Sequence, residues 1–435
     1  MTSPLWNELR FGARALLRDG PGDRRRLRAL ACTEAMTAVQ LHALQAELLH
    51  RTLHSAIERL PRYAHIRPGF PPSAAFEVLR EAFPVIDKQD LLADKGSLYP
   101  LKAPWLAVGR TSGTTGTPLA VLRSAESVRM EQAFVKRHWA WAGYRDGMVR
   151  ATLRGDLVVD PARTRPPFWF WNRYNRQLLV SSRHLCEEHA DAIVDRLEAL
   201  APAMLQAYPS TAFALAGLLE RRGRRLNIPV VFTASEPLHE HQRALILERV
   251  GAKVMDMYGM AERVAFATEC EHGNLHINLD YAYVEIIDGF VVGTTFHNQA
   301  MPLVRYRPGD RTQWKPGACA CGRAFPMIEP VTGKFEDMLT GGRGQPVSPS
   351  VLTFAFKGMA HIRKSQVAQV GPGSWEVRVV AAPGFSPHDL VDNIHRLADP
   401  HVAVKVVLKD ELPNSSAGKF RWVVNEYHPP KDHPA

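Results

Sequence analysis

The spacing of apolar residues along the chain predicts an alternation of helices and strands. Apolar side chains recur every three or four residues across 35–62, which indicates a helix that the segment Gly69-Phe-Pro-Pro72 breaks. The same periodicity predicts helices over 126–141, 187–200, 211–222 and 238–250, and short apolar runs predict strands at 106–108, 229–233 and 253–257. The order strand, helix, strand between 229 and 257 favours a parallel sheet with site loops at the carboxyl ends of its strands.

The pattern changes in the last third of the chain. Two apolar runs, 281–287 and 290–296, are joined through Asp288-Gly289, which predicts a β-hairpin. Beyond 330–337 the chain has helices and strands of its own, including strands at 375–381 and 402–408. We therefore expect an α/β protein. A large N-terminal domain, residues 1–332, would hold parallel or mixed sheets with helices, and a small α+β C-terminal domain would span residues 333–435.

Composition narrows the class of protein. A chain of 435 residues can bury at least one large core, and no 18 consecutive residues are apolar, so a membrane span is not expected. The N-terminus lacks the basic-then-apolar pattern of a signal peptide. Five cysteines, an odd number, fit a reducing compartment better than a disulfide framework. We expect a cytoplasmic protein. No signature of a nucleic-acid-binding fold is present.

The net charge is +10, and part of it is concentrated at the N-terminus. Seven arginines crowd the first 28 residues and interleave with apolar side chains such as Trp6, Leu9 and Leu16. Two interpretations are open: a helix packed on its own domain, or an amphipathic helix in contact with an anionic membrane surface or a partner. The first is the commoner case. The excess positive charge also suits anionic ligands such as ATP and CoA.

The segment 110–118, Arg-Thr-Ser-Gly-Thr-Thr-Gly-Thr-Pro, predicts an anion-binding loop. Glycine lets a backbone approach an anion closely, and successive N–H groups can form a concave nest around it. Hydroxyl groups add further donors. The expected anion is a nucleotide polyphosphate, although the spacing is not that of a P-loop. The alternative is a polar surface loop. The residues concerned are Thr111, Ser112, Gly113, Thr114, Thr115 and Gly116.

Further segments follow this loop in a fixed order: Tyr258-Gly-Met-Ala-Glu262, Tyr306-Arg-Pro-Gly-Asp310, Gly333-Lys-Phe-Glu-Asp337 and Ser416-Ala-Gly-Lys-Phe-Arg421. Together they resemble the adenylate-forming superfamily of acyl-CoA synthetases, peptide-synthetase adenylation domains and luciferases. The stretches 54–63, 83–88, 208–210 and Ser235-Glu236 resemble its phenylacetate–CoA ligase branch. The resemblance covers roughly residues 50–425, and several motifs in register are far more specific than one.

The resemblance implies roles for individual residues. Thr111 and the rest of its loop would hold the ATP phosphates, with a catalytic contribution from Thr111. Glu262 would bind Mg²⁺, since that ion prefers carboxylate and phosphate oxygens. Asp310 would accept hydrogen bonds from both ribose hydroxyls. The other nucleotide-binding residues implied are Ser235, Glu236, Tyr258, which would lie against the adenine, Gly259 and Lys334.

The resemblance also implies a mobile C-terminal domain. Lys419 would bridge the attacking carboxylate and the α-phosphate, and Glu336 falls at the hinge position. A mobile ammonium can enter the site for adenylation and leave it for the second step. Three positions depart from the family pattern. Leu119 stands where lysine is common, Ala261 replaces a hydroxyl-bearing residue, and Lys334 replaces arginine and loses its bidentate fork.

The implied activity is that of an ATP-dependent ligase. A small aromatic carboxylic acid would be activated as acyl-AMP, with release of pyrophosphate. The acyl group would then pass to a thiol, either of CoA or of a carrier protein's phosphopantetheine. Two alternatives remain open. The acceptor could be an amine or a hydroxyl, or the chain could be a non-catalytic adenylate-binding protein.

The cysteines suggest a second site. Cys270, His276, Cys319 and Cys321 together form a set suited to tetrahedral Zn²⁺, with His272 as a competing nitrogen ligand. The alternative is three buried free thiols. Cys32 and Cys186 are expected to behave as ordinary apolar residues. A cluster of aromatic residues is either the wall of an acyl pocket or plain core: Trp139, Trp141, Phe168, Trp169, Phe170 and Trp171.

Overall fold

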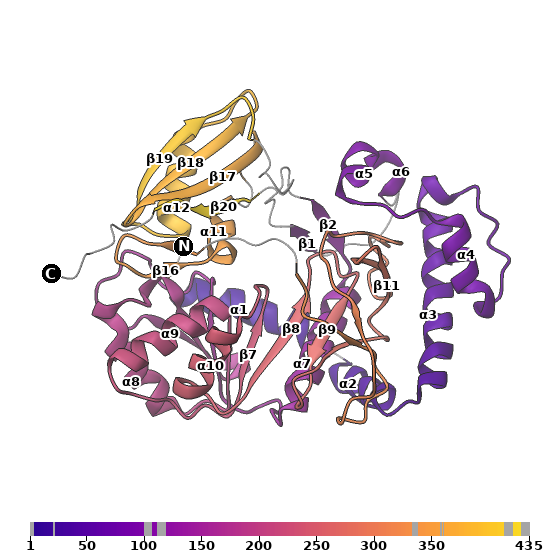
Figure 1. The fold of residues 1–435 in the computed structure, drawn as a ribbon, viewed down its shortest axis with the longest axis horizontal. Coiled ribbons are helices and arrows are strands. Elements are labelled where there is room, and N and C mark those ends of the chain that lie inside the picture. The colour runs from indigo at the N-terminus through magenta and orange to yellow at the C-terminus, as the bar shows by residue number, and fades with distance from the viewer. Residues whose placement is uncertain are drawn as a thin grey trace.

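The structure is a computed structural model that describes residues 4–20, 22–99, 107–110, 119–332, 338–356, 359, 361–412 and 421–427 (Figure 1). Helices α1 (Pro4–Arg18), α2 (Asp23–Glu34) and α3 (Ala38–Arg59) open the chain. The predicted helix 35–62 is thus α3 with tighter bounds. It starts at a capping box formed by Thr37 and Gln40. It ends before Pro61, not at 69–72, because a residue preceding proline disfavours the helical conformation and Leu60 is extended.

Three short helices follow, α4 (Ala75–Ala82), α5 (Lys88–Ala93) and α6 (Lys95–Leu98). They pack with α3 in one hydrophobic cluster, together with Leu119 and Val121 of the next segment. That segment is the antiparallel hairpin of β1 (Ala107–Arg110) and β2 (Ala120–Arg123), in which Arg110 pairs with Ala120. The residues that connect the two strands, 111–118, lie outside the described part of the chain.

A large mixed sheet forms the centre of the molecule. Its order among the described residues is β13-β14-β10-β9-β8-β7-β6-β3-β5-β4. The strands β5, β3, β6, β7 and β8 are parallel neighbours, and those at both ends of the sheet are antiparallel. Their bounds are β3 Arg150–Arg154, β4 Trp169–Asn172, β5 Gln177–Ser181, β6 Met204–Ala207, β7 Val231–Ala234, β8 Val254–Gly259, β9 Phe266–Glu269, β10 Leu275–Ile277, β13 Trp314–Lys315 and β14 Met327–Ile328.

Helices cover both faces of this sheet (Figure 1). On one face lie α8 (Ala190–Leu200), α9 (Pro209–Arg221) and α10 (Glu240–Arg249), and on the other α7 (Ala125–Trp141). Successive residues of a strand contact helices on opposite faces of the sheet. Val231 belongs to the hydrophobic cluster under α8–α10, and Phe232 packs with Trp139 of α7. The predicted strand–helix–strand unit is confirmed as β7–α10–β8, with β7 and β8 parallel.

The predicted hairpin is also confirmed. Strands β11 (Ala282–Ile287) and β12 (Phe290–Thr295) are antiparallel. Asp288 and Gly289 have φ values of 52° and 77°, as a two-residue turn of the primed type requires. A further small pair consists of β15 (Leu339–Thr340) and β16 (Pro346–Val347).

The last part of the chain builds a second sheet, of order β19-β18-β17-β20. It consists of β17 (Ile362–Gly371), β18 (Ser374–Ala381), β19 (Ala403–Leu408) and β20 (Val423–Asn425), with helices α11 (Pro349–Phe356) and α12 (Pro387–Leu397). These elements enclose their own cluster around Trp375 and Trp422, to which Tyr208 is added from the earlier chain. The two-domain division at 332/333 stays a prediction, and residues 333–337 lie outside the described part of the chain.

The aromatic cluster expected from the sequence does not form one wall. Trp139 packs with Tyr144 and Phe232, whereas Phe168 stacks on His189 with ring centroids 4.3 Å apart. Phe170 stacks on Phe11 of α1 at 5.6 Å. Trp169 packs against the same cluster as Phe168, and Trp171 is 37% exposed, so the run 168–171 is distributed over different surroundings. The interpretation as a single acyl pocket is therefore wrong: two of the six residues are buried core, three are half-buried against core clusters, and Trp171 is exposed.

Candidate nucleotide site and metal centre

The carboxyl end of β8 brings two residues of different motifs together. Tyr258, near the end of this strand, donates its hydroxyl proton to Asp310 Oδ2 at 2.8 Å. Burial and the adjacent Asp310 raise the pKa of the Tyr258 hydroxyl well above its ordinary value, so it remains a donor. Asp310 is held from the other side, because its carbonyl accepts a hydrogen bond from Val291 N at 2.9 Å. Next to Tyr258, Gly259 has little room for a side chain, since a Cβ would approach the Phe266 ring to 3.2 Å.

Glu262 lies in the turn that follows β8. The residue is 8% exposed, and its carboxylate oxygen Oε1 accepts a hydrogen bond from the Tyr306 hydroxyl at 3.3 Å. Burial and the nearby Glu262 raise the pKa of Tyr306. The next residue, Arg263, has φ = 60° and donates to Ser127 O at 2.6 Å. A buried carboxylate at a strand end, with a neutral hydroxyl beside it, has the donor chemistry that Mg²⁺ prefers.

Ser235 and Glu236 follow β7, the parallel neighbour of β8. Ser235 is exposed and has φ = 74°, a backbone conformation that non-glycine residues rarely adopt and that is found at ligand-binding turns. Glu236 Oε2 accepts a hydrogen bond from Ser210 N at 3.2 Å, at the first turn of α9. A carboxylate is favourable at that position because backbone N–H groups there have no helical partner. This contact gives Glu236 a structural role and connects the segment 208–210 with 235–236.

Several candidate residues lie outside the described part of the chain. They are Thr111, Ser112, Gly113, Thr114, Thr115 and Gly116 of the loop between β1 and β2, together with Lys334, Glu336 and Lys419. Their roles remain predictions.

One residue near this site was missed by the sequence reasoning. The Arg123 guanidinium, at the end of β2, donates from Nη2 to the carbonyl of Ala261 at 2.7 Å, next to Glu262. It passes over Gly109, where a Cβ would lie 2.4 Å from the guanidinium. Burial and the nearby Arg263 lower the pKa of Arg123 to about 10, so it is charged at neutral pH. The sequence did contain a signal for this residue. Because side chains alternate along a strand, Arg123 lies on the same face as the buried Leu119, which predicts a charged side chain directed into the protein.

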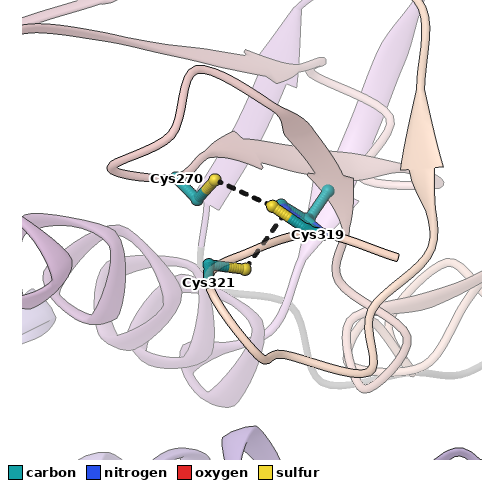
Figure 2. Close-up of side chains that lie close together, drawn as sticks. Cys270, Cys319 and Cys321 are labelled. Carbon is teal, nitrogen blue, oxygen red and sulfur yellow. Dashed lines mark hydrogen bonds between the residues drawn. The ribbon is translucent and has the colours of Figure 1, made fainter. Parts of the chain in front are cut away.

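The four proposed zinc ligands meet at the other end of β9. Ligand atoms of Cys270, His276, Cys319 and Cys321 all lie within 4.8 Å of one another. The sulfur atoms of Cys270 and Cys319 are 3.6 Å apart, and Cys321 Sγ is 3.5 Å from His276 Nε2. Figure 2 shows the three thiols converging from the end of β9 and from the loop between β13 and β14. The exposed His272 is not part of the cluster, so the choice between the two histidines falls on His276.

Two of the ligand-to-ligand distances in the cluster match those of a tetrahedral zinc site. Bonds of about 2.3 Å to sulfur and about 2.0 Å to nitrogen require edges of about 3.8 Å between sulfurs and about 3.5 Å between sulfur and nitrogen. Both observed distances are close to these values. His276 is also oriented as a metal ligand, because its Nδ1–H donates to Phe325 O at 2.7 Å and leaves Nε2 facing the thiols.

The thiols differ in their surroundings. Burial raises the pKa of Cys270 to about 11. Burial acts the same way on Cys319, but hydrogen bonds from the Cys321 backbone and from the Asn274 amide lower its pKa to about 6. Of the remaining cysteines, Cys186 is buried as expected, whereas Cys32 is exposed on α2, contrary to the apolar role expected for it.

The metal cluster is separate from the nucleotide motifs. Gly259 pairs with Phe266 at one end of the β8–β9 ladder, and Cys270 follows the opposite end of β9. Four strand residues separate these ends, or about 13 Å. The cluster thus connects β9, β10 and the 316–326 loop at a distance from the Tyr258–Asp310 pair.

Known proteins resemble the chain along most of its length. No family model matches it. It is 28% identical over 338 residues to the phenylacetate-coenzyme A ligase of Thermus thermophilus, which covers 70% of this chain and 73% of that one. The protein CapK of Staphylococcus aureus is 25% identical over 237 residues, 53% of each chain. The structure of a 2-hydroxyisobutyryl-CoA ligase in complex with 2-HIB-AMP and CoA aligns with a TM-score of 0.54 over 91% of this chain and 92% of that one. At 19% identity, that likeness shows the fold.

Proposed function

We propose that this chain, a homologue of the phenylacetate-coenzyme A ligases in the adenylate-forming superfamily, is an ATP-dependent acid–CoA ligase. It would join a carboxylic acid to AMP, release pyrophosphate, and transfer the acyl group to the thiol of CoA. The observation that carries the proposal is the hydrogen bond between Tyr258 and Asp310, with the buried Glu262 in the same turn. Residues 52 positions apart thereby form one polar site at the carboxyl end of β8.

The proposed roles follow the chemistry of each group. Asp310 would accept the ribose hydroxyls, and the Tyr258 ring would lie against the adenine. Ser235, Glu236 and Gly259 would line the same edge of the sheet. Glu262 would hold Mg²⁺, which neutralises charge on the phosphates when bound. The loop Thr111–Gly116 and Lys334 would contact the nucleotide.

We assign Arg123 to positioning. Its hydrogen bond to Ala261 O ties the β1–β2 hairpin to the turn that carries Glu262. The guanidinium also brings a positive charge to a region where Leu119 replaces a lysine that is common in the superfamily. Gly109 supports this role, because only a residue without Cβ leaves space for the guanidinium.

The C-terminal part of the chain is proposed to alternate between two orientations. In one, Lys419 would neutralise charge between the carboxylate and the α-phosphate. In the other it would have moved away, with Glu336 near the hinge. Contacts between the two parts in the observed arrangement include Arg183 Nε to Leu397 O at 2.7 Å and Arg343 Nη1 to His189 Nε2 at 3.0 Å.

A structural Zn²⁺ is proposed for Cys270, His276, Cys319 and Cys321. Four protein ligands leave no position for water or substrate, so such an ion stabilises and does not catalyse. When bound, it would crosslink segments about 45 residues apart in the chain.

The substrate is proposed to be a small aromatic acid, on the strength of the relative from Thermus thermophilus. The dispersed tryptophans and phenylalanines give that choice no support of their own. A second candidate function stays open, in which an amine or hydroxyl accepts the acyl group instead of a thiol. A carrier protein's phosphopantetheine is a third possible acceptor.

The experiment that separates these acceptors is an acyl-transfer assay. Purified protein would be incubated with Mg·ATP and a panel of aryl and fatty acids, without acceptor or with CoA, an acylatable carrier protein or simple amines. Mass spectrometry would identify the products. Formation of acyl-CoA in preference to the other products is expected. Accumulation of acyl-AMP that CoA does not consume would contradict a thiol acceptor.

A further inference from the structure

Helix α1 turns its arginines toward the protein. Asn7 and Phe11 are buried, and Asn7 Nδ2 donates to Val158 O at 2.8 Å. On the same side Arg10 and Arg14 both pair with Asp156, at 3.5 Å and 3.3 Å. The charged face of this amphipathic helix is therefore used internally, which is the reverse of the usual arrangement of a surface helix.

The opposite face of α1 is apolar and exposed. Leu5, Leu9 and Leu16 are 71%, 62% and 72% exposed. At 100° per residue the three side chains lie within about 40° of one another around the helix. They form one stripe that no other described element covers. Exposed leucines are unremarkable one by one, but a contiguous row is the signature of an interaction surface.

Two amphipathic rings border this stripe. Trp6 is 45% exposed, and Tyr174, of the short 3-10 turn Arg173–Asn175, is 48% exposed. Tyr174 lies against α1, since a Cβ on Gly12 would come within 3.0 Å of its ring. The three leucines, Trp6 and Tyr174 are called the α1 patch below. Leucines flanked by tryptophan and tyrosine are typical of segments that sit at the level of lipid headgroups.

The charge around the α1 patch is positive. The nearby acids are neutralised in part: Asp19 and Asp23 lie 2.7 Å and 2.8 Å from Lys136, which also contacts Asp146 at 2.9 Å, and Glu8 pairs with Arg173 at 3.2 Å. Arg24 lines the same surface hollow as Leu16.

Helix α2, which carries Arg24, has two more arginines of this kind. Arg24, Arg25 and Arg28 are exposed on α2 and form no ion pair among the residues that the structure describes. A partner for this surface must therefore be both apolar and anionic.

We propose that the α1 patch docks the protein on the surface of a bilayer that contains anionic lipids. The leucines would enter the boundary between headgroups and acyl chains, and Arg24, Arg25 and Arg28 would face lipid phosphates. A second copy of the chain is a poorer occupant, because a symmetric contact would bring the same arginines together. The docking helix lies on the surface. None of the described helices has the length and hydropathy that crossing a bilayer requires.

The proposal is tested by vesicle co-sedimentation of the full chain. Vesicles of phosphatidylcholine alone would be compared with vesicles of phosphatidylcholine and phosphatidylglycerol at about 7:3. The expected partition coefficient is at least about tenfold higher for the anionic vesicles, and it falls as salt is raised because the attraction is screened. Equal or absent binding to both vesicle types overturns the proposal.

Three variants refine the test. Replacing the three leucines of the α1 patch by serine should lower binding by more than about 100-fold. Replacing Arg24, Arg25 and Arg28 by glutamine should lower it by about fivefold per arginine. The matched control, Leu408→Ser on β19, removes an equally exposed leucine elsewhere and should bind like the wild type.

Two results would contradict membrane docking through the α1 patch. Serine substitutions that leave vesicle binding unchanged would exclude the α1 patch. A dimer in light scattering that these substitutions dissociate, without vesicle binding by the wild type, would show that a second copy covers the patch. The measurement needs no ligase activity, so its outcome is independent of the proposed function.

Discussion

Replacing Asp310 by alanine is expected to weaken ATP binding by about three orders of magnitude. The carboxylate is held in place by the Tyr258 hydroxyl at 2.8 Å and would offer acceptor positions to two ribose hydroxyls. A hydrogen bond to a charged group contributes about 1.5–3 kcal/mol. Loss of two such bonds corresponds to about 4 kcal/mol, or about 10³ in Kd.

Tyr258→Phe separates the ribose contact from the orientation of the carboxylate. This change removes one hydroxyl and keeps the aromatic ring and the charge of Asp310, so we expect a loss in ATP affinity of less than about tenfold. Glu329→Ala removes an exposed acid from a neighbouring loop and serves as the matched control.

The assay is isothermal titration of each variant with Mg·ATP, with thermal unfolding to show that the variants are folded. A Kd for Asp310→Ala within threefold of the wild type would refute the placement of the ribose. Equal losses for Asp310→Ala and Tyr258→Phe would show that the pair acts only as a structural contact.

Four further predictions concern metal, catalysis and stability. Elemental analysis should find about one equivalent of zinc, which Cys319→Ser reduces; a few tenths of an equivalent or less in the wild type would count against the metal centre. Lys419→Ala should lower pyrophosphate formation by about 10²–10³ and leave acyl transfer from synthetic acyl adenylate intact; a parallel fall of both half-reactions would contradict the two orientations. Arg123→Gln should raise the KM for Mg·ATP with little change in Tm, with Arg123→Lys restoring part of the loss; an unchanged KM would remove Arg123 from the site. Burial alone would raise the pKa of Asp280, but Arg137 holds it below its ordinary value through contacts of 2.6 Å and 2.9 Å. This stabilisation is present above the unfolded pKa of about 3.9 and is lost as the pH falls through the lower folded value. Arg137→Met should cost about 3–5 kcal/mol in denaturant unfolding at pH 7, and a loss below 1 kcal/mol would contradict it.

Regular elements with a strong period could be predicted from the sequence. The β7–α10–β8 unit and the β11–β12 hairpin were expected within a few residues, because their hydrophobic patterns and the Asp288-Gly289 turn are local signals. Strands β13 and β14 have two residues each and exist only through pairing with distant segments, so no local pattern announced them.

The site was predictable in type but not in geometry. Motif order identified Tyr258 and Asp310, and the structure brings them into contact. Spacing alone could not choose between His272 and His276, because both lie close to Cys270 in the chain. Only the fold orients one of them toward the thiols.

Helix α1 shows the limit of periodicity. Its pattern defines an apolar and a basic face, but not which face is buried. The answer depends on Asp156, about 140 residues away, with which Arg10 and Arg14 both form ion pairs. The aromatic run 168–171 was misinterpreted for a related reason, since Phe168 packs on His189 and Phe170 on Phe11, partners that the local pattern does not reveal.

The most direct test of the central claim is acid-dependent exchange of isotope between pyrophosphate and ATP. The protein would be incubated with Mg·ATP, labelled pyrophosphate and each acid of an aryl and aliphatic panel, with no acceptor present. Reversible formation of an acyl adenylate predicts label in ATP only when a suitable acid is added, and loss of that exchange in Asp310→Ala. Folded, metal-replete protein that shows no acid-dependent exchange with any acid of the panel, while still binding ATP, would contradict the account and favour a non-catalytic adenylate-binding protein.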